Sequence, residues 1–138
     1  MFFLHHAALS VGDLGRSESF YGLFGFRPVH RWSAPDGSLT IVHLKLGATL
    51  LELFSYRDHQ PAPESSRRLE TDLPRLGTKH LALGVDDADQ ARDFLLARGL
   101  RQVPEPAEGR TGVRYFFIQD PDGTLLEIVE DHRELASD

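Results

Sequence analysis

The sequence contains no cysteine among its 138 residues. A chain without thiols cannot form a disulfide framework, a zinc–thiolate or iron–sulfur site, or a cysteine nucleophile. Long hydrophobic runs are absent too, and none approaches the roughly 18 residues needed to span a bilayer. The apolar start, Met1–Leu4, is too short for the core of a secretory signal. We therefore expect a cytoplasmic protein without a membrane partner.

Positively charged residues are fewer than negatively charged ones. Lys and Arg number 15 against 21 Asp and Glu, which gives a net charge of −6 and a pI of about 5.6. That balance argues against a nucleic-acid-binding surface. The sequence has no phosphate loop, dinucleotide fingerprint or nucleophile elbow. What remains is an ordinary globular composition, 41% hydrophobic and 26% charged, in a chain long enough for one domain.

The chain contains an internal repeat. The stretch Leu4–Val11 reads LHHAALSV, and 74 residues further on Lys79–Val85 reads KHLALGV. After a shift of one residue, Thr49–Leu53 (TLLEL) matches Thr124–Ile128 (TLLEI). Each half thus has one histidine near its start and one glutamate near its end. Self-similarity of this kind indicates two copies of one structural unit.

Both halves predict the same order of elements, strand–helix–strand–strand–strand. Alternating apolar residues predict the strands, Asp13 and Asp87 stand where N-caps begin helices, and Gly25 and Gly99 stand where helices end. In the first half we expect strands at Phe2–Val11, Phe26–Trp32, Leu39–Leu46 and Thr49–Tyr56 and a helix at Leu14–Phe24. In the second half we expect strands at Thr78–Val85, Leu100–Val103, Val113–Gln119 and Thr124–Glu130 and a helix from Asp87 to about Arg98.

This order predicts an α+β fold made of paired βαβββ modules. We expect one domain over residues 1–138, with module 1 at about 2–57 and module 2 at about 76–131. The connecting loop, about 58–75, is long and contains three prolines, which is typical of a linker, a lid or a dimer arm. The tail from Asp131 onward is expected to fray.

Four residues are singled out by the repeat: His6, Glu52, His80 and Glu127. All four lie in predicted strands with apolar neighbours. A carboxylate in such surroundings costs several kcal/mol unless it is paired or bound to a metal. Two neutral imidazoles and two carboxylates balance the charge of a divalent cation, and they suit Zn, Ni, Co, Mn or Fe. A satisfied strand histidine or a solvent-facing glutamate explains any one of the four, but their recurrence at equivalent positions favours a metal site.

Several other side chains are weaker candidates for the site. Alternation places His5 on the face opposite His6, as a packing or surface residue, while His43 could line a pocket but suits the surface or core better. Phe116 and Phe117 are predicted to be core residues. Arginines could hold an anionic substrate, although a solvated loop is the simpler interpretation of the Arg67–Arg68 pair; the candidates are Arg31, Arg67, Arg68, Arg110 and Arg114.

On three features the sequence resembles the vicinal oxygen chelate superfamily. These are the two βαβββ halves, the run His6–Tyr21, and the turn Asp120–Gly123 followed by Leu126 and Glu127. The superfamily includes glyoxalase I, methylmalonyl-CoA epimerase, extradiol dioxygenases and the fosfomycin and bleomycin resistance proteins. The resemblance covers Leu4–Glu130. It implies a half-open barrel around a divalent metal.

The resemblance also implies a site and a reaction. His6, Glu52, His80 and Glu127 fall at the four ligand positions of glyoxalase I. The implied enzyme is a lyase or isomerase that chelates vicinal oxygens of a small carbonyl substrate and transfers a proton through an enediolate. Glu127 is favoured for the proton transfer, with Glu52 as its partner. A homodimer is implied as well, with the four ligands supplied by one chain or by two.

Other activities on the same fold stay open. Extradiol dioxygenases use three ligands, corresponding to His6, His80 and Glu127, and fosfomycin-resistance enzymes lack a glutamate matching Glu52. Methylmalonyl-CoA epimerase typically has a glutamine there, and bleomycin-binding members lack the ligand set. The intact set favours a glyoxalase-like enzyme. The alternatives are an epimerase of methylmalonyl-CoA or sugar-like type, a ring-cleaving dioxygenase, and a non-catalytic ligand-binding or resistance protein.

Overall fold

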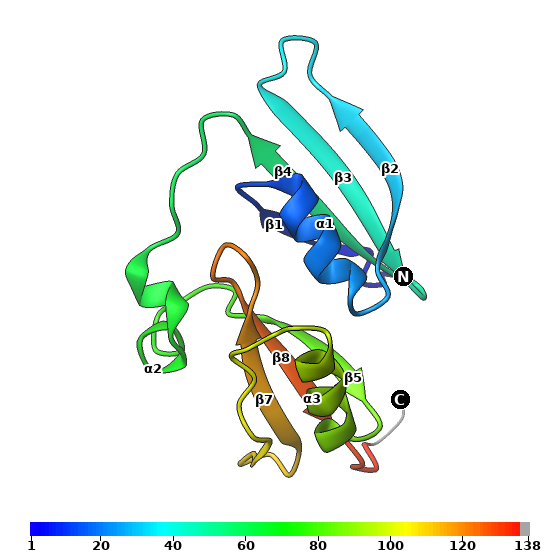
Figure 1. Cartoon of the computed structure of the whole chain (residues 1–138), viewed down its shortest axis with the longest axis vertical. Helices are drawn as coiled ribbons and strands as arrows, with labels where there is room; N and C mark the ends of the chain where they lie inside the picture. The colour runs from blue at the N-terminus through cyan, green and yellow to red at the C-terminus, as the bar shows by residue number, and fades with distance from the viewer. Residues whose placement is uncertain (136–138) are drawn as a thin grey trace. The chain divides into compact units, whose positions relative to one another are not determined.

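The structure is a computed structural model, and it describes residues 1–135. The chain divides between Ala62 and Pro63 into two compact units. Each unit contains one open, four-stranded mixed sheet and a helix that follows its first strand (Figure 1). The predicted α+β fold of paired βαβββ modules is therefore confirmed.

The first unit has a sheet of strand order β1-β4-β3-β2, in which β1 runs parallel to β4 and the other pairs are antiparallel. Val42 and Leu44 of β3 lie opposite Leu53 and Leu51 of β4, and all four are at most 1% exposed. The next residues along β3 and β4 therefore point to the other face of the sheet. The elements are β1 (His6–Ser10), α1 (Leu14–Gly22), β2 (Arg27–Ser33), β3 (Leu39–Leu46) and β4 (Thr49–Tyr56).

The second unit repeats this arrangement with the strand order β5-β8-β7-β6. Phe116 and Ile118 of β7 lie opposite Ile128 and Leu126 of β8, and these four residues form its buried face. The core role predicted for Phe116 is confirmed. The elements are β5 (Leu81–Val85), α3 (Ala88–Ala97), β6 (Ala107–Glu108), β7 (Arg114–Gln119) and β8 (Leu125–Glu130).

The one-residue shift in the repeat lies in the hairpin that precedes the glutamate strand. In the first unit Leu46 pairs with Thr49, so Gly47 and Ala48 alone form the loop. In the second unit the Asp120 amide donates to the Thr124 carbonyl at 3.0 Å, which leaves three residues, 121–123, in the loop. The longer loop is held by the buried Asp120 carboxylate, which accepts from the amides of Asp122 and Thr124 at 2.9 and 2.8 Å.

The first strand is shorter than the alternating pattern suggests. β1 begins at His6, and Phe2, Phe3 and Leu4 are at least 81% exposed. Alternation alone could not locate this boundary, because the segment has no strand opposite it: the parallel pairing with β4 begins at His6 and Leu50. The prediction that the strand starts at Phe2 is therefore wrong.

The edge strand of the second unit also lies at a different place from the one predicted. Residues 100–103 form no strand, although Val103 is buried, and the edge strand β6 is the two-residue segment Ala107–Glu108. Pro104 and Pro106 lack the amide hydrogens that a ladder requires, which explains why pairing begins only after them.

The connection between the sheets carries structure of its own. It contains a 3₁₀ turn, η1 (Glu64–Arg67), and one turn of helix, α2 (Leu69–Asp72). The tail is tied down at Arg133, whose guanidinium donates to the Thr111 carbonyl at 3.1 Å and pairs with Asp131. The hydrogen bond from Arg133 lowers the pKa of Asp131 to about 2. The rest of the predicted frayed tail, residues 136–138, lies outside the described residues.

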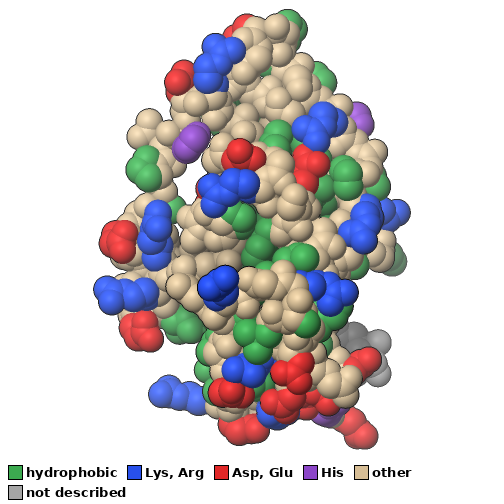
Figure 2. Space-filling view, viewed as in Figure 1, with side chains coloured by type: hydrophobic (Ala, Val, Ile, Leu, Met, Phe, Trp, Pro, Cys, Tyr) green, Lys and Arg blue, Asp and Glu red, His purple; other side chains and the backbone are tan. Residues whose placement is uncertain are grey.

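Charges of both signs are intermixed on the surface (Figure 2). Ion pairs occur in both units, among them Arg31–Glu18 in the first and Arg92–Glu105, at 2.7 Å, in the second. Over residues 1–135, no helix has the length and apolar character needed to cross a membrane.

Both long helices begin at the predicted caps. Asp13 accepts a hydrogen bond from the Arg16 amide at 2.9 Å, and Asp87 accepts one from the Gln90 amide at 2.9 Å. The bond from Gln90 holds the pKa of Asp87 below its ordinary value. These bonds satisfy amides that have no partner within the helix.

Replacing Asp13 by Ala removes one cap and should lower the free energy of unfolding by about 1 kcal/mol. Urea denaturation followed by circular dichroism measures this change. Ser19→Ala, at an exposed position of the same helix, is the control and should stay within about 0.5 kcal/mol of the wild type. Equal midpoints for the two variants would contradict a capping role for Asp13.

Candidate functional site

The first unit brings two of the four singled-out residues together. The Nε2 atom of His6 lies 3.5 Å from Oε2 of Glu52, and their side chains are 41% and 18% exposed. In the parallel pairing of β1 with β4, Ala8 lies opposite Glu52, so His6 projects from the same face two residues earlier. The glutamate stands between Leu51 and Leu53, whose burial fixes which way it points.

A third residue of this unit contacts the glutamate. His43 lies directly opposite Glu52 in the β3–β4 hairpin, and its Nε2 donates to Glu52 Oε1 at 2.8 Å. The sequence-based interpretation of His43 as a surface or core residue did not predict this contact. The signal was in the hairpin register, because a two-residue loop at Gly47–Ala48 pairs residue 43 with residue 52.

His5 lies beside His6 rather than on the opposite face. Their Nδ1 atoms are 2.8 Å apart and their rings meet edge to face. The prediction from alternation is wrong because β1 begins at His6, so the strand geometry does not extend to His5. His5 is exposed, as expected of a surface residue.

The second unit forms the equivalent pair. The Nε2 atom of His80 lies 3.0 Å from Oε2 of Glu127, and the side chains are 24% and 17% exposed. Ala82 lies opposite Glu127 in the parallel pairing of β5 with β8, as Ala8 lies opposite Glu52. His80 precedes β5 by one residue. Its Nδ1 atom is buried and has no hydrogen-bond partner within residues 1–135.

Phe117 takes the place in the second unit that His43 has in the first. It lies opposite Glu127 across the β7–β8 hairpin, and its ring meets that of His80 edge to face with centroids 4.9 Å apart. The two glutamates thus differ in their cross-strand partner. Glu52 faces an imidazole donor, whereas Glu127 faces an apolar ring.

The chemistry of these donors fits a divalent cation. Imidazole nitrogens and carboxylate oxygens bind such ions at about 2.0–2.2 Å, so two ligands of one ion stand about 3.0–3.4 Å apart. The His80–Glu127 separation of 3.0 Å falls within that spacing, and the His6–Glu52 separation of 3.5 Å lies just beyond it. Nowhere in the described part of the chain do three or more His, Asp or Glu side chains form a metal-binding group, so neither pair is complete by itself.

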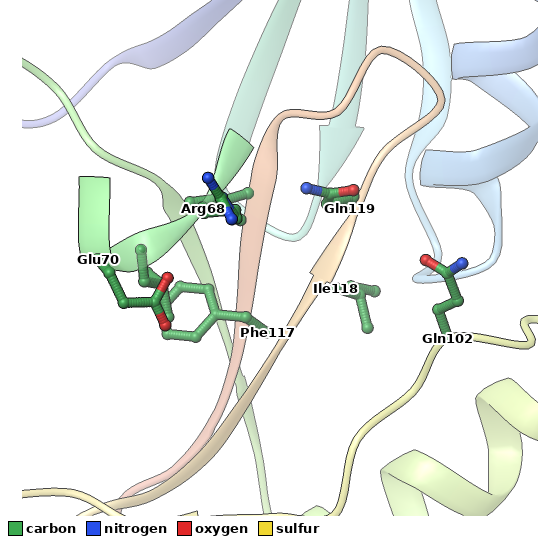
Figure 3. A pocket seen from close by; sticks show the side chains of 8 residues that line it. Arg68, Glu70, Gln102, Phe117, Ile118 and Gln119 are labelled. Atoms are coloured by element: carbon green, nitrogen blue, oxygen red, sulfur yellow. The ribbon is translucent and has the colours of Figure 1, made fainter. Parts of the chain in front are cut away.

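A cavity of about 400 Å³ lies in the second unit (Figure 3). Phe117 links this cavity to the His80–Glu127 pair, because it lines the cavity and its ring contacts that of His80. Phe117 is only partly buried, so the preference for a core role is wrong for this residue. The lining combines apolar, amide and charged side chains, namely Arg68, Leu69, Glu70, Gln102, Phe117, Ile118, Gln119 and Leu125.

Of the five candidate arginines, Arg68 is the one that lines the cavity. Its guanidinium forms no ion pair with any carboxylate of residues 1–135. Arg31 is paired with Glu18, and Arg114 is paired with Asp89 at 2.9 Å and with Glu130 at 3.2 Å. The hydrogen bond to Asp89 raises the pKa of Arg114. Arg67 pairs with Glu64, and Arg110 is exposed away from the lining.

The segment that carries Arg68 is fixed by a buried carboxylate. Asp72, at the end of α2, is 1% exposed and accepts from Arg75 at 2.9 Å and from Lys79 at 3.4 Å. Lys79 also donates to the Asp72 carbonyl at 2.9 Å and directly precedes His80. Burial acts to raise the pKa of Asp72, but the bonds from Arg75 and Lys79 outweigh it and the pKa is lowered. Asp72 thus joins α2 to the segment that carries His80 and leads into β5.

Two βαβββ units, each with a histidine and a glutamate facing one another beside its sheet, define a class of paired-module proteins. The profile of the Glyoxalase/Bleomycin resistance protein/Dioxygenase superfamily matches residues 3–128. The chain belongs to this superfamily, and the resemblance drawn from the sequence is confirmed.

Individual relatives agree over nearly the whole chain. A Bacillus subtilis (strain 168) protein named Uncharacterized protein YwkD is 32% identical over 92% of this chain and 95% of its own. A Synechocystis protein named Probable lactoylglutathione lyase is 29% identical over 93% and 95%. The crystal structure of a glyoxalase family protein from Enterococcus faecalis, 27% identical, covers 93% of this chain and 97% of its own with a TM-score of 0.78.

The Asp72 contacts predict an acid-sensitive contribution to stability. Because its folded-state pKa lies below 3.8, the carboxylate stabilises the protein above that pH, and the contribution is lost as pH falls through the lower folded value. Asp72→Asn should therefore lower the unfolding midpoint at neutral pH, and the difference should shrink below about pH 4. Thermal denaturation across pH measures it, with the exposed Asp58→Asn as control. A difference independent of pH would contradict the ionic role.

Proposed function

We propose that the protein is a divalent-metal-dependent lyase or isomerase of the glyoxalase type. The observation that carries this proposal is the recurrence of one imidazole–carboxylate pair at equivalent positions of the repeat in both units. The proposed ligands are His6, Glu52, His80 and Glu127. The relative named Probable lactoylglutathione lyase supports the reaction type. In this proposal the two units act as one domain, and a homodimer is the working assembly.

The donor set suits the proposed cofactor. Two neutral imidazoles and two carboxylates compensate the charge of Zn, Ni, Co, Mn or Fe in the divalent state. A cation held there would supply Lewis-acid chemistry, polarising neighbouring oxygens of a small carbonyl substrate and stabilising negative charge on them.

Glu127 is the better candidate for the proton transfer. Its Oε2 faces His80, while its Oε1 has no hydrogen-bond partner within the described residues. Both oxygens of Glu52 are engaged, one by His6 and one by His43. In the proposed reaction the Glu127 carboxylate takes the proton from the carbon next to the substrate carbonyl and returns it to the adjacent carbon.

The cavity beside His80 is the proposed binding place for the rest of the substrate. Its lining includes Phe117, Ile118 and Leu125, which suit an apolar body, and Arg68, which suits an anionic group such as a carboxylate. A small anionic carbonyl compound therefore matches both the ligand pairs and the cavity.

Glu127→Gln keeps the size of the side chain and one ligand oxygen but cannot accept the proton. Turnover of the methylglyoxal–glutathione adduct should fall by at least about 100-fold, with most of the metal retained. Product formation by absorbance and metal-to-protein ratios by elemental analysis test this. Glu105→Gln, at an exposed partner of Arg92, should behave like the wild type.

His80→Ala tests the metal site, because loss of a proposed ligand should lower the metal-to-protein ratio. His132→Ala, at an exposed histidine, is the control and should keep the ratio of the wild type. An unchanged ratio would exclude the proposed site. A fully active Glu127→Gln would exclude the base assignment. Oxygen uptake with a catechol and Fe(II), in place of the isomerase reaction, would identify a dioxygenase.

Arg68→Met removes the cationic group from the cavity and leaves an apolar stem. If Arg68 holds an anionic group equally in the ground and transition states, KM should rise by about 10- to 100-fold with kcat nearly unchanged. Steady-state kinetics measure both constants. Arg67→Met is the matched control, since Arg67 is paired with Glu64 and does not line the cavity. Equal KM values for both variants would show that Arg68 does not contact the substrate.

A further inference from the structure

The two glutamates of the repeat are held in different ways. In the first unit His43 lies across the hairpin from Glu52 and donates to its Oε1 at 2.8 Å. In the second unit the equivalent position is Phe117, which has no hydrogen-bond donor to offer Glu127. The same backbone register therefore presents one restrained carboxylate and one less restrained carboxylate.

The contact of His43 occupies one oxygen of Glu52 and leaves the other facing His6. A carboxylate has only acceptor atoms, so His43 Nε2–H is the donor and Oε1 the acceptor. The other oxygen, Oε2, faces His6 Nε2 at 3.5 Å. Glu52 is 18% exposed and His43 30% exposed, so the bond is shielded from water on part of its surface.

The surroundings of His43 favour this single orientation. Its neighbours along β3, Val42 and Leu44, are at most 1% exposed, which fixes the backbone on which the imidazole stands. The ring of His30 on β2 lies 5.5 Å from the ring of His43, centroid to centroid, and shows no bond to Glu52. The orientation of the imidazole is thus set by its own strand, β3, and by its bond to Glu52.

We propose that His43 is a positioning residue that holds Glu52 by Oε1, so that this glutamate offers only Oε2, beside His6, to the metal. The inference rests on the proposed function, because it concerns the same metal ligands. The asymmetry also separates the roles of the two glutamates. Glu52 becomes the stationary ligand, and Glu127, which faces Phe117, keeps the freedom to move a proton.

The test compares His43→Phe, which copies the second unit, with His43→Gln, whose amide can donate from nearly the same place as Nε2. Metal-free proteins are titrated with Co(II), and affinity and the visible absorption spectrum are recorded. Residues that orient metal ligands typically change affinity by about 10- to 100-fold. We expect His43→Phe to weaken Co(II) binding by at least about 10-fold and to alter the spectrum. His43→Gln should restore both most of the way.

His30→Phe is the matched control, because it removes a neighbouring histidine from the same sheet without touching Glu52. It should leave affinity and spectrum unchanged. Circular dichroism of every metal-free variant checks the fold. If His43→Phe does not fold, the test rests on His43→Gln. The Co(II) affinity of His43→Gln should then lie within about threefold of the wild type, whereas Glu52→Gln should lose at least about 10-fold.

The outcomes separate the two proposals. A wild type that binds no Co(II) overturns the proposed function and this inference with it. A wild type that binds Co(II) no more tightly than His43→Phe overturns the inference alone. Loss of binding in both His43→Phe and His43→Gln also overturns it, because that result identifies His43 as a metal ligand rather than a positioning residue.

Discussion

The orientation of the candidate ligands depends on the two-residue alternation of side chains between the faces of β4 and β8. Leu51 and Leu53 are buried on one face of β4, so Glu52 between them must point to the other face. In β8 the buried residues Leu126 and Ile128 direct Glu127 in the same way. A shift of one residue in either strand would place a carboxylate in the core, which is far more costly than any single contact in the site. The packing of the core therefore fixes the orientation of the candidate ligands.

Much of this arrangement could be predicted because the constraint is local and is repeated. The alternation of apolar and polar residues in the sequence predicted β3 and β4 with the bounds that the structure shows. The repeat then selected one histidine and one glutamate in each half, and the structure pairs them within each unit. Alternation failed where no neighbouring strand enforces it, as at Phe2–Leu4 before β1 and around the prolines before β6.

Other parts of the site depend on contacts that leave little trace in the sequence. His43 meets Glu52 only through the register of a two-residue hairpin loop. Arg68 reaches the cavity through a single helical turn held by buried Asp72 and its bond to Lys79, seven residues away. No periodicity marks so short an element, and the prolines around it suggested an irregular connection. The repeat offered no help for either residue, since each lacks a counterpart of the same type in the other half.

The position of the candidate ligands on the face opposite the core also bears on how folding and the proposed metal binding would be related. Small zinc domains lack a core and fold only when the metal is bound. Here each sheet has an apolar face of its own, with Val42 and Leu44 in the first unit and Phe116 and Ile118 in the second nearly inaccessible to solvent. The carboxylates already have imidazole partners, so their charge is compensated in part without a cation. If the proposed function is right, metal binding would complete a site on a scaffold that is already formed. That separation allows the contacts around each glutamate to diverge, as His43 and Phe117 have, without altering the repeated core.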